Sequence, residues 1–130
     1  MLQIDRRSSR PAYVQIVDEL SDMILTGTLG PNEQIPSVRT LAIDLAINPN
    51  TIQKAYGLLE RAGITYTQPG VGRFVAPDAR DAIARSRAGR LNELRPLLTD
   101  LAQAGVPRTQ VDAVVREVYK EKEDGHDSSK

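Results

Sequence analysis

The 130-residue chain carries 17 basic and 17 acidic residues and no cysteine, so its formal net charge is zero. The absence of cysteine excludes disulfides, thiolate metal sites and cysteine nucleophiles. A hydrophobic share of 40% and a charged share of 26% are typical of a soluble globular protein. Because neither an export signal nor a long apolar segment is visible, we expect a cytoplasmic protein without a membrane partner.

The basic residues are unevenly distributed, although zero net charge gives no overall indication of nucleic-acid binding. Between residues 36 and 75, four basic residues stand against two acidic ones. Arg6, Arg7 and Arg10 add a basic cluster near the N-terminus. Solvated surface charge explains these counts as well as nucleic-acid binding does, so the charge distribution alone does not distinguish the two.

The first two predicted helices are amphipathic. Pro11 suits the first helical position and Gly27 the position just after the helix end, with apolar residues at helical spacing between them. After a turn-rich connection, Ser37 can cap a second helix because its hydroxyl accepts from first-turn N–H groups. We expect that helix to end near Ala46. Its apolar face is formed by Val38, Leu41, Ala42 and Leu45.

A third helix is predicted over "NPNTIQKAYGLLERAG", residues 48–63. Asn48 is a favoured N-cap, Pro49 stands where its missing N–H costs nothing, and Gly63 ends the helix. The side predicted to face the core gathers Ile52, Ala55, Tyr56, Leu59 and Ala62. The opposite side, which is either solvated or functional, gathers Asn50, Gln53, Lys54, Gly57 and Arg61.

A β-hairpin is predicted directly after the third helix. The β-branched and aromatic run 64–67 and the run 73–75 flank "QPGVG", a turn. Three helices followed by a hairpin indicate a mainly α protein with a winged helix-turn-helix domain over residues 1–77.

Residues 78–122 are predicted to form a helical hairpin. A long helix begins near Asp78 and reaches Gly105, and Pro96 should kink or divide it. A last helix opens at Pro107. The apolar seam of the first helix consists of Leu91, Leu94, Leu98 and Leu101. The apolar face of the last helix consists of Val111, Val114, Val115, Val118 and Tyr119.

These apolar stripes exceed what one short hairpin can bury. Dimerisation through them is the favoured interpretation, and packing of the hairpin on its own winged domain is the alternative. The polar residues 123–130 are expected to be disordered. His126, the sole histidine, lies there, and we expect no catalytic or metal-binding role for it.

The motifs resemble a known family. The run "GTLGPNEQIPSVRTLAIDLAINPNTIQKAYGLLERAGI" followed by "GVGRFV" is similar to the N-terminal domain of GntR-family bacterial transcription regulators. The segments "PAYVQIVDEL" and "NPNTIQKAYGLLE" look most like its YtrA branch, in which a short helical tail follows the DNA-binding domain. The likeness spans residues 2–77. Two departures lie in the wing: its turn lacks a basic residue, and Arg73 replaces a common threonine.

The resemblance implies a sequence-specific regulator, commonly a repressor, with duplex operator DNA as its partner. The recurrent contacts of the family match Arg39, Asn50, Thr51 and Gln53. A homodimer would suit a palindromic operator, because the two symmetries must match. No operator sequence or small-molecule effector can be named from the residues.

The chemistry of the residues agrees with that role. The third helix can lie in the major groove with its N-terminal turn, including Pro49, towards base edges. Amide side chains pair with adenine, and Lys54 suits guanine or a phosphate. Ser37 is a helix cap first and a phosphate donor second. Gly70 and Gly72 would let the wing approach the minor groove, or serve a tight turn that needs positive φ.

The sequence also bears on two other function classes. No nucleophile–base constellation, metal-ligand cluster or phosphate loop is visible, so we expect neither an enzyme nor a cofactor. A winged helix used as a protein-interaction module, without specific DNA binding, is the alternative that zero net charge leaves open. It predicts no sequence preference and no salt dependence with duplex DNA, whereas a regulator shows both.

Overall fold

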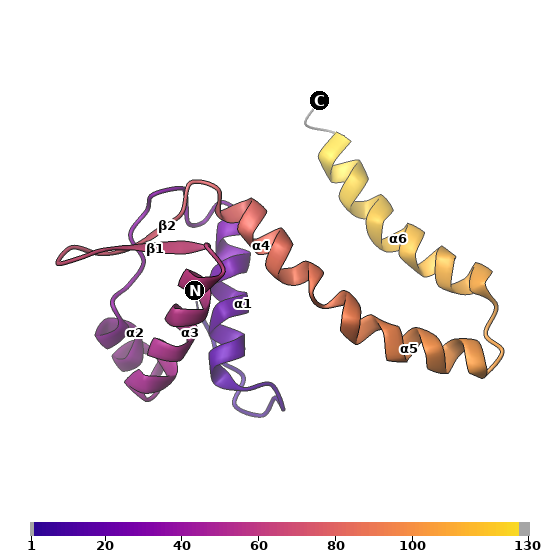
Figure 1. The fold of residues 1–130 in the computed structure, drawn as a ribbon, viewed down its shortest axis with the longest axis horizontal. Coiled ribbons are helices and arrows are strands. Elements are labelled where there is room, and N and C mark those ends of the chain that lie inside the picture. The colour runs from indigo at the N-terminus through magenta and orange to yellow at the C-terminus, as the bar shows by residue number, and fades with distance from the viewer. Residues whose placement is uncertain (1, 128–130) are drawn as a thin grey trace. The chain divides into compact units, whose positions relative to one another are not determined.

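The computed structural model describes residues 2–127, with side chains described as far as residue 120. The chain forms two compact units, residues 1–88 and 89–130. The elements of the first unit (Figure 1) are α1 (Ala12–Leu25), α2 (Val38–Leu45), α3 (Pro49–Arg61), β1 (Thr65–Gln68), β2 (Gly72–Val75) and α4 (Ala79–Ala88). This order confirms the predicted winged helix-turn-helix with a small hairpin.

The core of the first unit lies between α1 and α3. Ile16 and Leu20 of α1 are buried together with Ile52, Tyr56 and Leu59 of α3. Burying an apolar side chain of this size contributes roughly 1.5–3 kcal/mol. The predicted apolar face of α3 is therefore confirmed, and its packing leaves the opposite face of α3 to the solvent.

The ends of the helices follow the predicted local chemistry with one small difference. Ser37 caps α2 by accepting from the Thr40 N–H at 3.1 Å, and Asn48 caps α3 by accepting from the Asn50 N–H at 2.8 Å. Pro11 is the residue before α1 rather than its first member, because its ψ of 149° is extended.

The segment before α1 is held by Gln15 and Arg6. The buried Gln15 amide accepts from the Asp5 N–H at 2.8 Å and donates to the Asp5 carbonyl at 3.0 Å. The Arg6 guanidinium donates to the carbonyls of Leu45 and Ala46, at 2.8 and 3.3 Å. These carbonyls stand at the C-terminal end of α2, where helices leave acceptors without partners.

The hairpin is a short antiparallel ribbon. Its register pairs Thr65 with Val75 and Gln68 with Gly72, so each strand is displaced slightly from its predicted span. Ile64, predicted to begin the first strand, is instead a buried residue just before β1. Gln34 forms an isolated bridge to Phe74, which attaches the connection before α2 to the hairpin.

The compact winged unit reaches Ala88, beyond the boundary predicted at Pro77. Helix α4 belongs to the winged unit because Ala79, Ala82 and Ile83 are buried in its core. An ion pair between Arg87 of α4 and Asp22 of α1, at 2.7 Å, reinforces this attachment. The winged unit therefore contains a fourth helix that the sequence pattern assigned to the tail.

The second unit contains α5 (Leu91–Gln103) and α6 (Arg108–Asp127). The predicted long helix is divided between Ala88 and Leu91, and Pro96 lies within an uninterrupted α5. Gly89 explains the position of the break, since glycine is about 1 kcal/mol less favourable than alanine in a helix.

Helix α6 extends as far as Asp127, into the segment that was expected to be disordered. The stretch from Lys120 onward is rich in lysine and glutamate, which are good helix formers. Residues 128–130 lie outside the described part of the chain. Within that part, no helix is both long and apolar enough to cross a membrane.

Candidate nucleic-acid interface

The N-terminal turn of α3 begins on the exposed surface of the helix-turn-helix. Ala46 ends α2 in the left-handed conformation, with φ of +53°, and Asn48 already caps α3, so the two helices are joined by a very short turn. Pro49 and Asn50 are exposed, whereas Thr51 is half-buried. The Asn48 side chain occupies the Asn50 N–H, while the Asn50 amide lies on the exposed surface of the first turn.

Gln53 continues this exposed surface by one turn. Gly57 follows on the same side, and a Cβ built there meets nothing within 4 Å. No packing inside the described part of the chain therefore requires a glycine at this position. The exposed side of α3 consequently presents the amides of Asn50 and Gln53 and, at Gly57, backbone without a side chain.

Arg39 and Ser37 stand at the beginning of α2. Arg39 is exposed in the first helical turn. The Ser37 hydroxyl accepts from the Thr40 N–H and donates to Thr40 Oγ1 at 2.9 Å. Its capping role is therefore confirmed, and the same hydrogen bonds occupy the hydroxyl that could otherwise donate to a phosphate.

Lys54 is drawn towards α1. Its Nζ lies 4.0 Å from the centroid of the Tyr13 ring, a cation–π contact. The predicted polar side of α3 is thus divided, because Asn50 and Gln53 face the solvent while Lys54 reaches over a neighbouring helix.

The wing turn needs both of its glycines for conformational reasons. Gly70 has φ of +77° and Gly72 has φ of +151°. A Cβ on Gly72 would also stand 2.3 Å from Gln34 Nε2, a group that donates to the Val71 carbonyl at 3.2 Å. The conformation of the tight turn is therefore sufficient to explain why residue 72 is a glycine. Val71 is the exposed side chain at the wing tip.

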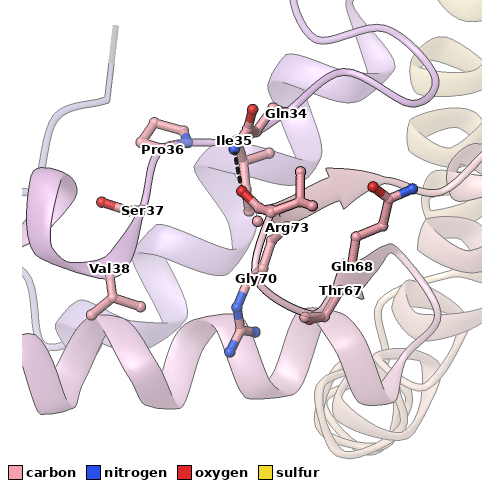
Figure 2. Close-up of a pocket in the computed structure, with 11 residues that line it drawn as sticks. Gln34, Ile35, Pro36, Ser37, Val38, Thr67, Gln68, Gly70 and Arg73 are labelled. Atoms are coloured by element: carbon pink, nitrogen blue, oxygen red, sulfur yellow. Dashed lines mark hydrogen bonds between the residues drawn. The ribbon is translucent and has the colours of Figure 1, made fainter.

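A cleft of about 340 Å³ separates the wing from the segment that leads into α2. Figure 2 shows Ser37 and Val38 on one side of it, with the wing residues on the other. The Ile35 N–H donates to the Arg73 carbonyl at 2.9 Å, so backbone pairing closes one end of the cleft. This backbone pairing attaches the wing to the segment that leads into α2.

Arg73 is the residue whose place the sequence did not predict. Its side chain is only 21% exposed, and its Nη1 lies 3.7 Å from Glu60 Oε1 of α3. Its guanidinium carbon is 5.5 Å from the centroid of the Tyr56 ring. Only the departure from the family's usual threonine marked this position in advance.

Tyr56 lies beneath this contact and is fully buried. Its hydroxyl donates to the Pro36 carbonyl at 2.7 Å. Burial raises the pKa of the Tyr56 hydroxyl to about 12, and the nearby charge of Arg73 acts in the opposite direction. Tyr56 therefore stays neutral at physiological pH and links α3 to the start of α2.

Comparison with known proteins agrees with this geometry. Residues 12–75 match the family described as bacterial regulatory proteins, gntR family. The HTH-type transcriptional repressor YtrA of Bacillus subtilis is 37% identical over 119 residues, covering 91% of this chain and 92% of that protein. The chain belongs to the GntR family. It is accordingly a DNA-binding transcription regulator and not an enzyme.

Solved structures of GntR-family proteins have the same fold. A GntR family transcriptional regulator from Listeria monocytogenes superposes with a TM-score of 0.66 at 32% identity, over 85% of this chain and 96% of that one. The DNA-binding domain of AraR, solved in complex with operator ORX1, gives a TM-score of 0.53 at 31% identity, over 58% of this chain and 96% of that one.

Among the described residues, no group of three or more His, Cys, Asp or Glu is placed to hold a metal ion.

Proposed function

We propose that the chain is a repressor that binds a palindromic operator as a homodimer. The observation that carries the DNA contact is the exposed first turn of α3, together with the exposed Arg39 in the first turn of α2. In this arrangement α3 lies in the major groove, where Asn50 and Gln53 read base edges through their amides. The helix N-terminus, with Pro49 and Thr51, lies against a phosphate.

The remaining contacts position the protein without reading bases. Arg39 reaches a phosphate or a base from beside the groove, and Lys54 contacts a phosphate at the edge of α3. Ser37 acts chiefly by fixing the turn that carries Arg39. The wing backbone at Gly70 and Gly72 approaches the neighbouring minor groove.

The homodimer is supported by the apolar surface of the second unit. Helix α5 buries no residue, and Leu91, Leu94 and Leu98 are exposed. A groove of about 770 Å³ between α5 and α6 is lined mainly by leucine and valine side chains. Val114, Val115 and Val118 of α6 are also exposed, whereas Leu101 and Val111 are half-buried. A contiguous apolar surface of this kind is typical of an interface, and a second copy of the chain supplies a matching one.

Repression is supported by the similar protein that carries that name, YtrA of Bacillus subtilis. A dimer seated over a promoter excludes other proteins from the same DNA. No small-molecule effector is part of the proposal.

Selection of bound duplexes from a random library, at moderate salt, tests the DNA contact. We expect an inverted repeat to be enriched. Arg39→Ala and Asn50→Ala should each weaken binding by about 1–3 kcal/mol, and Asn50→Ala should also relax the preference at one position of each half-site.

Arg85→Ala, which removes an exposed cation of α4, is the matched control and should bind like the wild type. A folded, dimeric wild type that enriches no sequence would instead favour a protein-interaction module. If the two variants bound as tightly as the control, the assigned contact residues would be wrong even though the protein reads DNA.

A further inference from the structure

A single carboxylate of α3 connects the recognition helix to both strands of the wing. Glu60 Oε1 accepts a hydrogen bond from the Thr67 hydroxyl of β1 and lies 3.7 Å from Arg73 Nη1 of β2. Thr67 and Arg73 are direct cross-strand partners, so their side chains lie on the same face of the hairpin. The wing is therefore held to α3 across its full width.

The Arg73 guanidinium is partly enclosed by this arrangement. Its Nη1 is shielded from solvent and makes no hydrogen bond within the described part of the chain. Figure 2 shows the side chain leaving the hairpin on the side of α3. The Arg73 side chain is 21% exposed and that of Glu60 43% exposed, so the pair is only partly shielded, and the shielded nitrogen of Arg73 is stabilised by the nearby carboxylate.

Tyr56 extends the connection to α2. Its ring lies next to the Arg73 guanidinium, and its hydroxyl donates to the Pro36 carbonyl, directly before the cap of α2. Three parts of the DNA-facing surface thus meet at one cluster: the wing, the recognition helix and the start of α2.

We propose that Glu60, Thr67 and Arg73 form a wing latch that fixes the wing against the recognition helix, with Arg73 as a positioning residue and not a phosphate contact. The proposal rests on the proposed contact of α3 and the wing with DNA. A wing held in place reaches the neighbouring groove without being ordered during binding, and this ordering would otherwise weaken the complex. Loosening the latch lowers affinity and leaves the base preference of α3 unchanged.

The direction in which one substitution changes DNA affinity distinguishes the wing latch from a simple electrostatic effect of Glu60. Glu60→Gln removes a negative charge near the DNA-facing surface, so electrostatics alone predicts tighter binding. The latch predicts weaker binding, because the same change releases Arg73. Arg73→Met, which keeps most of the apolar stem, weakens binding under both views and therefore cannot decide alone.

The experiment measures affinity for the selected duplex over a series of salt concentrations, for the wild type, both single variants and the double variant. We expect each single variant to bind about three- to tenfold more weakly. The double variant should lose little more, because both changes break one contact. The salt slope should stay unchanged, whereas loss of a phosphate contact would reduce it by about 0.9. Arg85→Met is the control for removal of one cation.

Amide hydrogen exchange of residues 65–75 in the free protein provides a second readout. Faster exchange of the wing in both single variants is expected, with α1 unchanged. Tighter or unaltered binding by Glu60→Gln, or wild-type exchange of the wing in both variants, would overturn the proposal. The exchange measurement requires no DNA, so it decides on the latch even if the wild type selects no duplex and the proposed operator binding fails.

Discussion

Tyr56 combines complete burial with a hydroxyl that donates to the Pro36 carbonyl. Its pKa is about 12 in the folded protein against 10.0 for an ordinary tyrosine. The folded state therefore favours the neutral side chain. The resulting stability is fully present below about pH 10 and is lost as the pH rises through about 12, by roughly 2–3 kcal/mol.

Tyr56→Phe tests this expectation. The variant loses the hydrogen bond to Pro36 and should be about 1–3 kcal/mol less stable than the wild type near neutral pH. Its free energy of unfolding should then fall less steeply than that of the wild type above about pH 10, in urea titrations at several pH values. Parallel curves for the two proteins would show that another group causes the alkaline loss.

Side-chain roles set by local chemistry could be predicted, whereas roles set by tertiary neighbours could not. Asn48 and Ser37 act as caps because each accepts a hydrogen bond from an N–H two or three residues further along the chain. Such short-range hydrogen bonds can be predicted from the local order of residues. Lys54 over Tyr13 and Arg73 beside Glu60 join residues from different elements. Helical periodicity placed Lys54 on the polar side of α3, but it could not show that α1 supplies an aromatic ring there.

At the scale of the element, α3 carries a glycine that its own packing does not require. Gly57 is inside the helix, and an added Cβ meets nothing within 4 Å. Gly57→Ala should therefore raise the free energy of unfolding by about 0.5–1 kcal/mol, measured by urea titration.

Gly27→Ala is the matched control. Its added Cβ also meets nothing within 4 Å, but its φ is +84°. This variant should lose about 1 kcal/mol, because a left-handed conformation disfavours a side chain. A loss of stability in Gly57→Ala as well would mean that the free space around α3 is not available to a methyl group.

Element types could be predicted more reliably than element ends. The periodicity of residues 79–103 indicates helix throughout, and it is the packing of Ala82 and Ile83 into the winged core that assigns α4 to the first unit. Proline at 96 was the stronger local signal for a break, yet the break is at Gly89. Helix α4, before Gly89, is stabilised by burial in the winged core, whereas α5, after Gly89, has no buried residue. This difference in burial is not apparent from the sequence alone.

For the whole molecule, the apolar seam of α5 predicts a concentration-dependent dimer. Leu98→Glu places a charge on that seam and should shift the protein to monomer at micromolar concentration, as measured by sedimentation. A charge that would be buried without a partner costs several kcal/mol at an interface. The variant should also bind the full inverted repeat far more weakly than the wild type.

Asn92→Glu is the matched control, because it introduces the same charge on the side of α5 away from the leucines. It should remain dimeric. If Leu98→Glu sedimented like this control, dimerisation through α5 and α6 would be excluded as the explanation of the exposed leucine and valine side chains.

Helix α4 also determines where this chain can be cut or joined. A fragment that ends at Pro77 lacks Ala79, Ala82 and Ile83, and so exposes the part of the core that they cover. A DNA-binding fragment must extend through Ala88, and a chimera with another C-terminal module should be joined in the Gly89–Arg90 segment. At the same position, a different C-terminal domain can replace the tail without changing the winged unit.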